Sequence, residues 1–229
     1  MSSISQQHLA ALTSFLSSYD AKDKFTGVIQ YGAMFLADGE PGINKNIYTK
    51  VASARKVFRL LNETKPAKAL LGKPGIGDGP MALELLEKVK MVSYATYFLG
   101  GHIQLLGDIG IVNDKELCAN AGKASYWGWA ISSICAALMD TYQIANLAVA
   151  RREGEDDETW AARKAAARTN LYKRLLNIAN SSATAVLALG MLGKIPMKNR
   201  SLAALGVTTS LVTCYTMYPA LPSSKAKTS

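Results

Sequence analysis

The first part of the chain alternates apolar and polar residues with the spacing of amphipathic helices. After Ser5, which suits a helix N-cap, four apolar residues fall three or four positions apart: Leu9, Leu12, Leu16 and Tyr19. Asp20 can cap a second helix, whose apolar side would hold Phe25, Val28, Gly32 and Phe35. A turn at 38–42 that is rich in glycine and proline ends this helix. We therefore expect two short helices, and packing of one on the other accounts for their apolar sides.

The next apolar stripe lies in a strongly basic segment. Over a predicted helix at 47–65, apolar residues recur at i, i+4, i+7, i+11 and i+14, namely Ile47, Val51, Ala54, Phe58 and Leu61. Basic residues border this stripe at Lys50, Arg55, Lys56 and Arg59. The pattern is typical of a helix in a membrane interface, with the stripe inserted and the basic side chains on lipid phosphates. Docking of the stripe on the preceding helices, or on the apolar helices that follow, is the alternative interpretation.

A stretch rich in glycine and proline at 67–80 separates this region from the remainder of the chain. It does not match a phosphate-binding loop, because Ala67 stands where the first glycine belongs and Pro74 follows Lys73. We interpret it as a linker. The sequence thus divides into an N-terminal helical region at 1–66, the linker at 67–80 and an apolar helical region at 81–229.

The last region contains four nearly uncharged segments, at 91–112, 124–150, 178–193 and 201–224. A charged segment at 151–176 is expected to form a connecting helix, because its acidic residues precede its basic ones as the helix dipole favours. The second and fourth segments are long enough to cross a hydrocarbon core of about 30 Å, so two spans and four spans both remain open. We predict an all-α fold: a helical membrane protein with N-terminal amphipathic helices followed by about four apolar helices.

Composition and charge favour a membrane partner. Of the 229 residues, 49% are hydrophobic and only 19% are charged, which excludes an intrinsically disordered chain. Lys and Arg exceed Asp and Glu by 26 to 17, and between Asn44 and Pro74 eight basic residues stand against Glu63 alone. A basic segment suits nucleic acid or anionic lipid. The apolar context and the lack of interleaved aromatic residues favour an anionic phospholipid membrane and no nucleic acid.

Candidate catalytic and metal-binding residues are scarce. The three cysteines lie far apart in the sequence, there are only two histidines, and no hydrolase or metalloprotease motif occurs. We therefore expect no enzyme, no metal site and no cofactor. Ionisable residues inside the apolar segments, at His102, Asp108 and Asp140, motivate an alternative function as a membrane pore or transporter for small metabolites.

The C-terminal tail carries Lys225 and Lys227, at the spacing of a dilysine coat-binding signal. Coatomer is then a candidate partner. The competing interpretation is that both lysines anchor the last helix by reaching to the lipid headgroups.

Four blocks of the sequence resemble the peroxisomal biogenesis factor 11 family, over nearly the whole chain. The block from Asp23-Lys24 through Gln30-Tyr31-Gly32 to Phe35-Leu36 is similar to the family's "DK…QYG..FL" pattern. Residues 54–60, Ala-Arg-Lys-Val-Phe-Arg-Leu, resemble its "ARKVFRL" block almost letter for letter. Looser similarity extends over Trp127–Leu147 and over the apolar end of the chain, at 171–189 and 206–219.

The resemblance implies a protein of the peroxisomal membrane, or of a related microbody such as a glycosome. It implies a multi-pass arrangement with both termini in the cytosol. It further implies a non-enzymatic homo-oligomer that bends and elongates the membrane through its amphipathic helix, and so promotes proliferation and fission of the organelle with the fission machinery as a partner.

Overall fold

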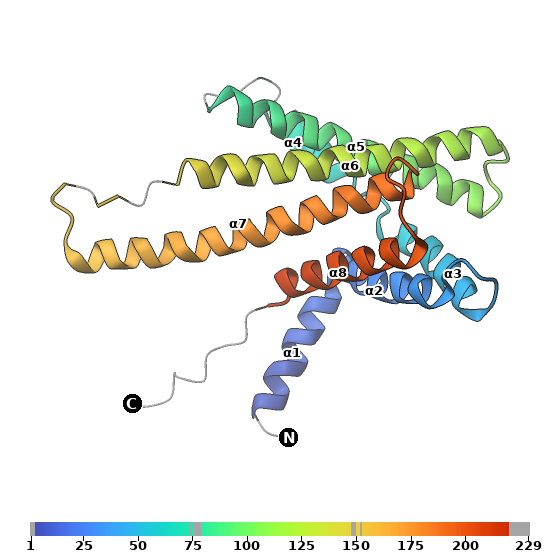
Figure 1. The fold of residues 1–229 in the computed structure, drawn as a ribbon, viewed down its shortest axis with the longest axis horizontal. Helices are drawn as coiled ribbons and strands as arrows, with labels where there is room; N and C mark the ends of the chain where they lie inside the picture. The colour runs from blue at the N-terminus through green and yellow to red at the C-terminus, as the bar shows by residue number, and fades with distance from the viewer. Residues whose placement is uncertain (1–2, 74, 76–78, 148–149, 152, 220–229) are drawn as a thin grey trace. The chain divides into compact units, whose positions relative to one another are not determined.

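The computed structural model describes residues 3–73, 75, 79–147, 150–151 and 153–219, and within these residues all regular structure is α-helical. The helices are α1 (Ser3–Ser17), α2 (Tyr19–Ala37), α3 (Ile43–Phe58), α4 (Thr64–Gly72), α5 (Met81–Asp108), α6 (Lys115–Ala145), α7 (Asp157–Met191) and α8 (Asn199–Met217), as Figure 1 shows. The predicted all-α class is confirmed for this part of the chain.

The helices form two compact units that do not follow the chain order. One unit combines Met1–Leu60 with Met197–Ser229, and the other comprises Leu61–Pro196. The last helix therefore belongs with the first three, whereas the sequence placed it in one apolar region at 81–229. The predicted division at 66 and 80 overlooked this return of the chain, because local composition carries no information about which distant helices pack together.

In the first unit, α2 packs against both α3 and α8. The turn between α2 and α3 was predicted at 38–42, and the backbone there has positive φ at Asp38, Gly39 and Gly42. Gly206 of α8 allows the close approach of α2, because a Cβ at this position would overlap the ring of Tyr31. α1 adds a ring contact between Phe15 and Tyr218, with centroids 5.6 Å apart.

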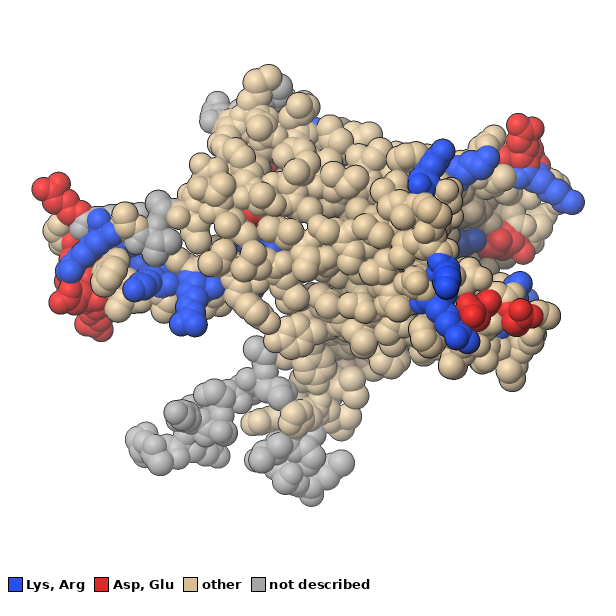
Figure 2. All heavy atoms as spheres, viewed as in Figure 1, with Lys and Arg blue, Asp and Glu red and all other residues tan. Residues whose placement is uncertain are grey.

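In the second unit, α6 packs against α5 on one side and α7 on the other. Helices α6 and α7 each begin after a capping aspartate. Asp114 accepts a hydrogen bond from the Leu117 amide at 2.9 Å at the start of α6, and Asp156 accepts one from the Thr159 amide at 2.8 Å at the start of α7. Figure 2 shows charged side chains gathered around the loop that precedes α7, whereas the middle of these helices is mostly uncharged on the face shown.

Small residues line the contact between α5 and α6 and leave no room for a Cβ at two positions. A Cβ at Gly100 would overlap the carbonyl oxygen of Ala121, and one at Gly128 would overlap that of Ser93. Across the same contact, the Ser125 hydroxyl donates to the Tyr97 carbonyl at 2.8 Å. We call the contact defined by these six residues the small-residue seam.

The structure corrects several boundaries. The helix predicted at 47–65 ends at Phe58, and the linker predicted at 67–80 begins inside α4. The charged segment predicted at 151–176 joins the apolar segment at 178–193 in the single helix α7. A helix continues wherever backbone geometry and packing permit, so a change from charged to apolar composition does not end it.

Among the described residues, no helix combines the length and the apolar character needed to cross a membrane. The apolar segments do form helices, within α5, α6, α7 and α8. The mean hydropathy of these helices is lowered by glycine, serine and threonine residues at the helix contacts and by charged residues at the helix ends. The predicted multi-pass arrangement, and with it the expectation of two cytosolic termini, is therefore not supported.

Candidate functional site: a basic helix held by buried charges

Helix α3 is attached to α2 by a buried group of charged and polar side chains. The Arg55 guanidinium donates from Nε to Asp23 Oδ1 at 3.0 Å and from Nη2 to Oδ2 at 3.3 Å. Its Nη1 donates to Gln30 Oε1 at 2.6 Å, and Arg59 Nε lies 3.1 Å from Asp23 Oδ1. We call Asp23, Gln30, Arg55 and Arg59 the α2–α3 ion-pair network.

The network follows from residue spacing on the two helices. Asp23 and Gln30 lie seven residues apart, and Arg55 and Arg59 lie four apart, so each pair occupies one helix face. Arg59 is also the C-cap of α3, and its Nε donates to the Arg55 carbonyl at 3.2 Å. Two guanidiniums on α3 therefore face a single carboxylate on α2.

The surroundings leave the network little access to water. Asp23 is 3% exposed and Arg55 is 5% exposed. Gly27 makes room for the Arg55 guanidinium, since a Cβ there would lie 2.8 Å from Ser210 Oγ and 3.1 Å from Arg55 Cζ. The guanidinium also lies over the Tyr31 ring, 5.6 Å from its centroid.

The electrostatic balance favours an ionised Asp23. Burial by itself raises the pKa of this carboxyl, but the positive charges of Arg59, Lys24 and Arg55 and the hydrogen bond from Arg55 lower it well below its usual range. The carboxylate therefore stays charged at neutral pH. Removing it would leave buried guanidiniums without their counterion.

The inward face of α3 is centred on Arg55 rather than on the predicted stripe. Tyr48, two turns before Arg55, is half-buried, and burial raises the pKa of its hydroxyl. Of the predicted membrane-inserting residues, Val51 and Phe58 are half-buried at the edge of this face, whereas Ile47 and Ala54 are exposed. One part of the predicted stripe therefore packs against the unit, and the other part is exposed to solvent.

The exposed apolar edge of α3 includes residues that the sequence analysis overlooked. Ile43 is 75% exposed and Val57 is 51% exposed, and they lie on the same side of the helix as Ile47 and Ala54. Leu61, the last predicted member, lies beyond the helix end with φ of 63° and is exposed. We call Ile43, Ile47, Ala54 and Val57 the exposed apolar edge of α3.

The four predicted phosphate-binding residues separate into two pairs. Lys50 is exposed and Lys56 is half-buried at the surface. Arg55 and Arg59 pair with the buried Asp23 carboxylate, an arrangement that competes with binding of a phosphate, so their role as lipid contacts stays a prediction. Asp23, one of two acidic residues in α2, is the counterion that the sequence analysis did not connect with Arg55 and Arg59.

The residues that suggested a pore have structural partners or line a different feature. Arg174 donates to Asp140 at 2.7 Å, and His102 Nδ1 lies 3.6 Å from Glu63 Oε2. Asp108 lines a cavity at the end of α5. The partners explain Asp140 and His102 structurally, and the pore or transporter function stays an alternative prediction.

The remaining candidates from the sequence are metal-ligating residues, the cysteines and the two lysines of the tail. In the part of the chain that the structure describes, no group of three or more His, Cys, Asp or Glu residues is placed to hold a metal ion. All three cysteines are free, and burial raises the pKa of the Cys135 and Cys214 thiols. Lys225 and Lys227 lie outside the described residues, so the coat-binding hypothesis stays a prediction.

Comparison with known proteins gives one family and several full-length relatives. The family model described as Peroxisomal biogenesis factor 11 (PEX11) matches residues 9–218. The chain is 32% identical over 224 residues to Peroxisomal membrane protein 11C of Arabidopsis thaliana, covering 95% of each protein. It is 30% identical over 227 residues to Peroxisomal membrane protein 11-1 of Oryza sativa subsp. japonica, covering 96% of this chain and 95% of the relative. No solved structure matches the chain.

The two most specific sequence blocks meet in the α2–α3 ion-pair network. The first block, at 23–36, contributes Asp23 and Gln30, and the second, at 54–60, contributes Arg55 and Arg59. Two patterns that are separate along the chain therefore describe one physical contact.

Proposed function

The chain belongs to the peroxisomal biogenesis factor 11 family, and we propose that it is a non-enzymatic protein of the peroxisomal membrane that promotes proliferation of the organelle. Family membership over residues 9–218 and the names of the full-length relatives support this proposal. The working element is α3, which lies on the membrane surface with its exposed apolar edge inserted into one leaflet.

The observation that carries this mechanism is the exposed apolar edge of a basic helix. Ile43 is 75% exposed and Val57 is 51% exposed on the same side of α3, and each large apolar side chain that enters lipid contributes about 1.5–3 kcal/mol. At 100° per residue, Lys50 lies between Ile43 and Val57 on this side of the helix, whereas Lys45 and Lys56 lie on the opposite side. A lysine near an anionic leaflet adds about 1 kcal/mol to the contribution of the apolar side chains, which supports reversible binding.

The α2–α3 ion-pair network gives the helix its orientation. Arg55 and Arg59 are directed inward by Asp23, so the helix can present its apolar edge only on the side away from α2. In this arrangement the lysines, with long flexible stems, contact lipid phosphates in place of the two arginines. The network therefore positions α3 and does not itself bind lipid.

A helix inserted to about 5–10 Å in one leaflet expands that leaflet and favours curvature towards it. Curvature grows when many copies act together, so a homo-oligomer suits this mechanism. The curved membrane is then the substrate on which the fission machinery would act.

The test is vesicle binding and tubulation by the full-length chain. The variant Ile43→Ser, Ile47→Ser, Val57→Ser removes the apolar edge while leaving the ion-pair network intact. We expect at least a tenfold loss of affinity for anionic vesicles, which corresponds to about the free energy of burying one large apolar side chain. We also expect loss of tubulation.

A matched control is the variant Leu85→Ser, Val89→Ser, Val92→Ser. These α5 residues are also exposed, at 54%, 39% and 54%, and share a helix face, but Glu84, Glu87, Lys88 and Lys90 surround them with balanced charge. Their substitution should leave binding to anionic vesicles nearly unchanged. If the α3 variant tubulates vesicles like the parent, α3 is not the membrane-bending element.

A further inference from the structure

Helix α5 carries a row of mostly apolar residues along one side of its whole length. The row repeats at intervals of four and three residues over three heptads, with the members Leu85, Val89, Val92, Thr96, Leu99, Ile103 and Leu106. Five of these side chains are exposed, from 36% at Leu106 to 54% at Leu85 and Val92. We call these seven residues the outer row of α5.

Helices of the same unit occupy both flanks of the outer row. On one flank, Tyr97 and Gly100 meet α6 in the small-residue seam. On the other flank, His102 Nδ1 lies 3.6 Å from Glu63 Oε2, next to the start of α4. At 100° per residue the outer row lies between these two flanks, so it is the side of α5 that remains open to a further partner.

The residue types of the outer row are those of a two-stranded coiled coil. Intervals of four and three average 3.5 residues, which keeps the row facing a partner helix along its length. In heptad notation the a positions are all β-branched, namely Val89, Thr96 and Ile103. Three of the four d positions are leucine, in the order Leu85, Val92, Leu99 and Leu106. β-branched residues at a with leucine at d favour a parallel dimer, so a second copy of α5 is a suitable partner.

Contact with lipid does not require this pattern. A helix side that meets acyl chains only has to be apolar over a broad arc, whereas the outer row is narrow, with Lys88 at its border and Thr96 at its centre. The Thr96 hydroxyl donates to the Val92 carbonyl at 3.0 Å, so Thr96 can enter an apolar contact with its hydrogen bond kept. The narrow row therefore fits a helix better than a lipid surface.

The size of the outer row fits a weak dimer. From Leu85 to Leu106 the helix rises about 32 Å, and a strip about 10 Å wide then covers on the order of 300 Å². A standard interface buries about 800 Å² per partner. Copies are therefore mostly separate in dilute solution, and they pair where a membrane surface raises their effective concentration.

We propose that α5 pairs in parallel with α5 of a second copy of this chain through the outer row. The a residues of one copy pack against the a residues of the other, and d against d. The proposal deepens the proposed function and rests on it in one respect, since membrane binding by α3 brings the copies together. Each pair then joins two copies of α3, which concentrates their insertion in one leaflet.

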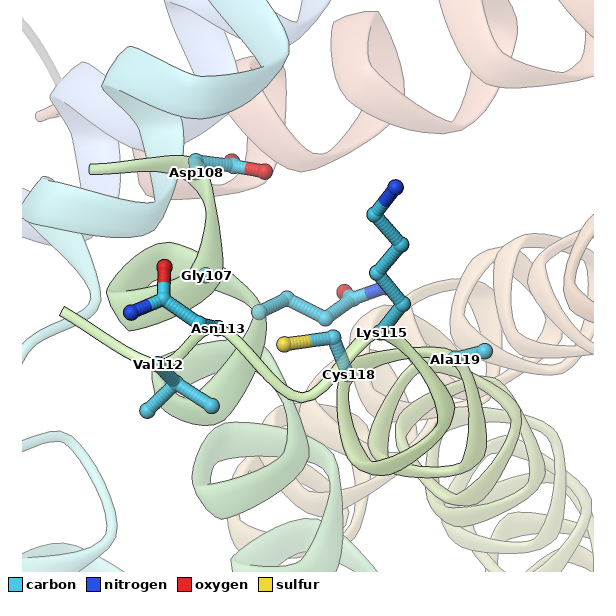
Figure 3. A pocket seen from close by; sticks show the side chains of 8 residues that line it. Gly107, Asp108, Val112, Asn113, Lys115, Cys118 and Ala119 are labelled. Atoms are coloured by element: carbon cyan, nitrogen blue, oxygen red, sulfur yellow. The ribbon is translucent and has the colours of Figure 1, made fainter. Parts of the chain in front are cut away.

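The cavity at the turn between α5 and α6 is separate from the outer row. Figure 3 shows its walls, where Gly107 of α5 lies beside Cys118 of α6. Gln104, another wall residue, lies against Gly122 of α6. No member of the outer row is among the described residues that line this cavity, so substitutions in the row leave the cavity unchanged.

Cross-linking of full-length chains tests both the contact and its orientation. In a chain whose three cysteines are replaced, Val89→Cys places identical thiols opposite each other in a parallel pair. In an antiparallel pair centred on Thr96, residue 89 of one copy would instead lie opposite residue 103 of the other. We expect a short thiol cross-linker to join Val89→Cys chains on anionic vesicles and in concentrated solution. The matched control Ile134→Cys, which is 42% exposed on α6, should stay monomeric under the same conditions.

Two substitutions in the outer row should change the pairing in opposite directions. Thr96→Ile adds an apolar contact at the central a position and should tighten the dimer about tenfold. Leu99→Asp places two carboxylates opposite each other and should weaken it at least tenfold. Sedimentation equilibrium of the full-length chain measures both changes, and circular dichroism verifies that the helices are retained. Ile131→Asp, at a position that is 38% exposed on α6, should sediment like the parent.

Two further variants separate this proposal from the membrane role of α3. The α3 variant Ile43→Ser, Ile47→Ser, Val57→Ser should pair in concentrated solution like the parent, whatever its affinity for vesicles. The α5 variant Leu85→Ser, Val89→Ser, Val92→Ser should bind vesicles from dilute solution but sediment as a monomer and tubulate vesicles less.

The proposal is overturned if Val89→Cys cross-links no more than Ile134→Cys, or if Thr96→Ile and Leu99→Asp both sediment like the parent. If only a mixture of Val89→Cys chains with Ile103→Cys chains is joined, the pair is antiparallel and the parallel arrangement is wrong.

Discussion

The α2–α3 and α5–α6 contacts both join neighbouring helices, but opposite kinds of residue hold them. Asp23 and Arg55 connect α2 and α3 through side chains that are 3% and 5% exposed. Gly100 and Gly128 bring α5 and α6 together until backbone atoms touch. The first contact depends on charge and the second on shape, so each should respond to a different perturbation.

The largest effect is expected from Asp23→Asn. The substitution keeps the size of the side chain but removes the negative charge that pairs with Arg55 and Arg59, and loss of one partner of a buried pair costs about 3–5 kcal/mol. Chemical denaturation of the full-length chain measures the change in free energy of unfolding. The double variant Asp23→Asn, Arg55→Met should recover part of the loss, and equal stability of Asp23→Asn and the parent would show that the network does not hold α3.

A somewhat smaller loss is expected from Gly100→Ala. The new Cβ would overlap the Ala121 carbonyl oxygen, and backbone cannot yield as a side chain does, so we expect about 3 kcal/mol of destabilisation. Gly101→Ala is the matched control, because no atom lies within 4 Å of its Cβ position. Alanine should stabilise this helix position by up to about 1 kcal/mol. Equal thermal stability of the two variants would show that the small-residue seam does not hold α5 and α6 together.

Acid should weaken the α2–α3 contact selectively. Because the folded pKa of Asp23 lies below its unfolded value of about 3.9, its contribution is fully present above that value. It is lost as the pH falls towards the lower folded pKa, by up to about 1.4 kcal/mol per pH unit. Urea denaturation at pH 5 and at successively lower pH measures this slope, and Asp23→Asn should abolish the Asp23 part of it. The same slope in parent and variant would contradict the assignment.

The smallest effect is expected at an exposed ion pair. Arg200 Nε lies 3.1 Å from Asp38 Oδ2, but these side chains are 62% and 41% exposed. Exposed pairs contribute about 0–1 kcal/mol, and salt screens them. Arg200→Gln should therefore change the melting temperature little, and a loss comparable to that of Asp23→Asn would mean that exposure is a poor guide to the strength of ion pairs in this protein.

The sequence predicted the helices better than their contacts. Helical periodicity located the elements around Leu9, Phe25 and Ile47, and the turn at 38–42, because these depend on neighbouring residues. The inward orientation of Arg55 was not predicted, since a stripe calculated from apolar residues alone ignores a buried carboxylate on another helix. The return of α8 to the first unit was likewise not predicted, because the fit of Gly206 against Tyr31 joins residues far apart in the chain.

The same limit applies to the candidate site. Basic residues around 50–59 were identified, but periodicity could not separate Lys50, which is exposed, from Arg55, which is buried. Ile43 was omitted because the predicted helix began at Ile47, whereas α3 begins at Ile43 itself. One additional turn at the N-terminus of the helix moved the exposed apolar edge towards residues that the sequence analysis did not include.

The orientation of α3 at a membrane is the central claim, and fluorescence at single positions tests it most directly. In a full-length chain whose three cysteines are replaced, an environment-sensitive fluorophore is attached through a new cysteine at Ile47 or at Thr49, which is exposed on the opposite side of α3. On addition of anionic vesicles, we predict a blue shift and protection from aqueous quencher at position 47 and little change at position 49. Equal protection at both positions, or protection at position 49 alone, would contradict the account.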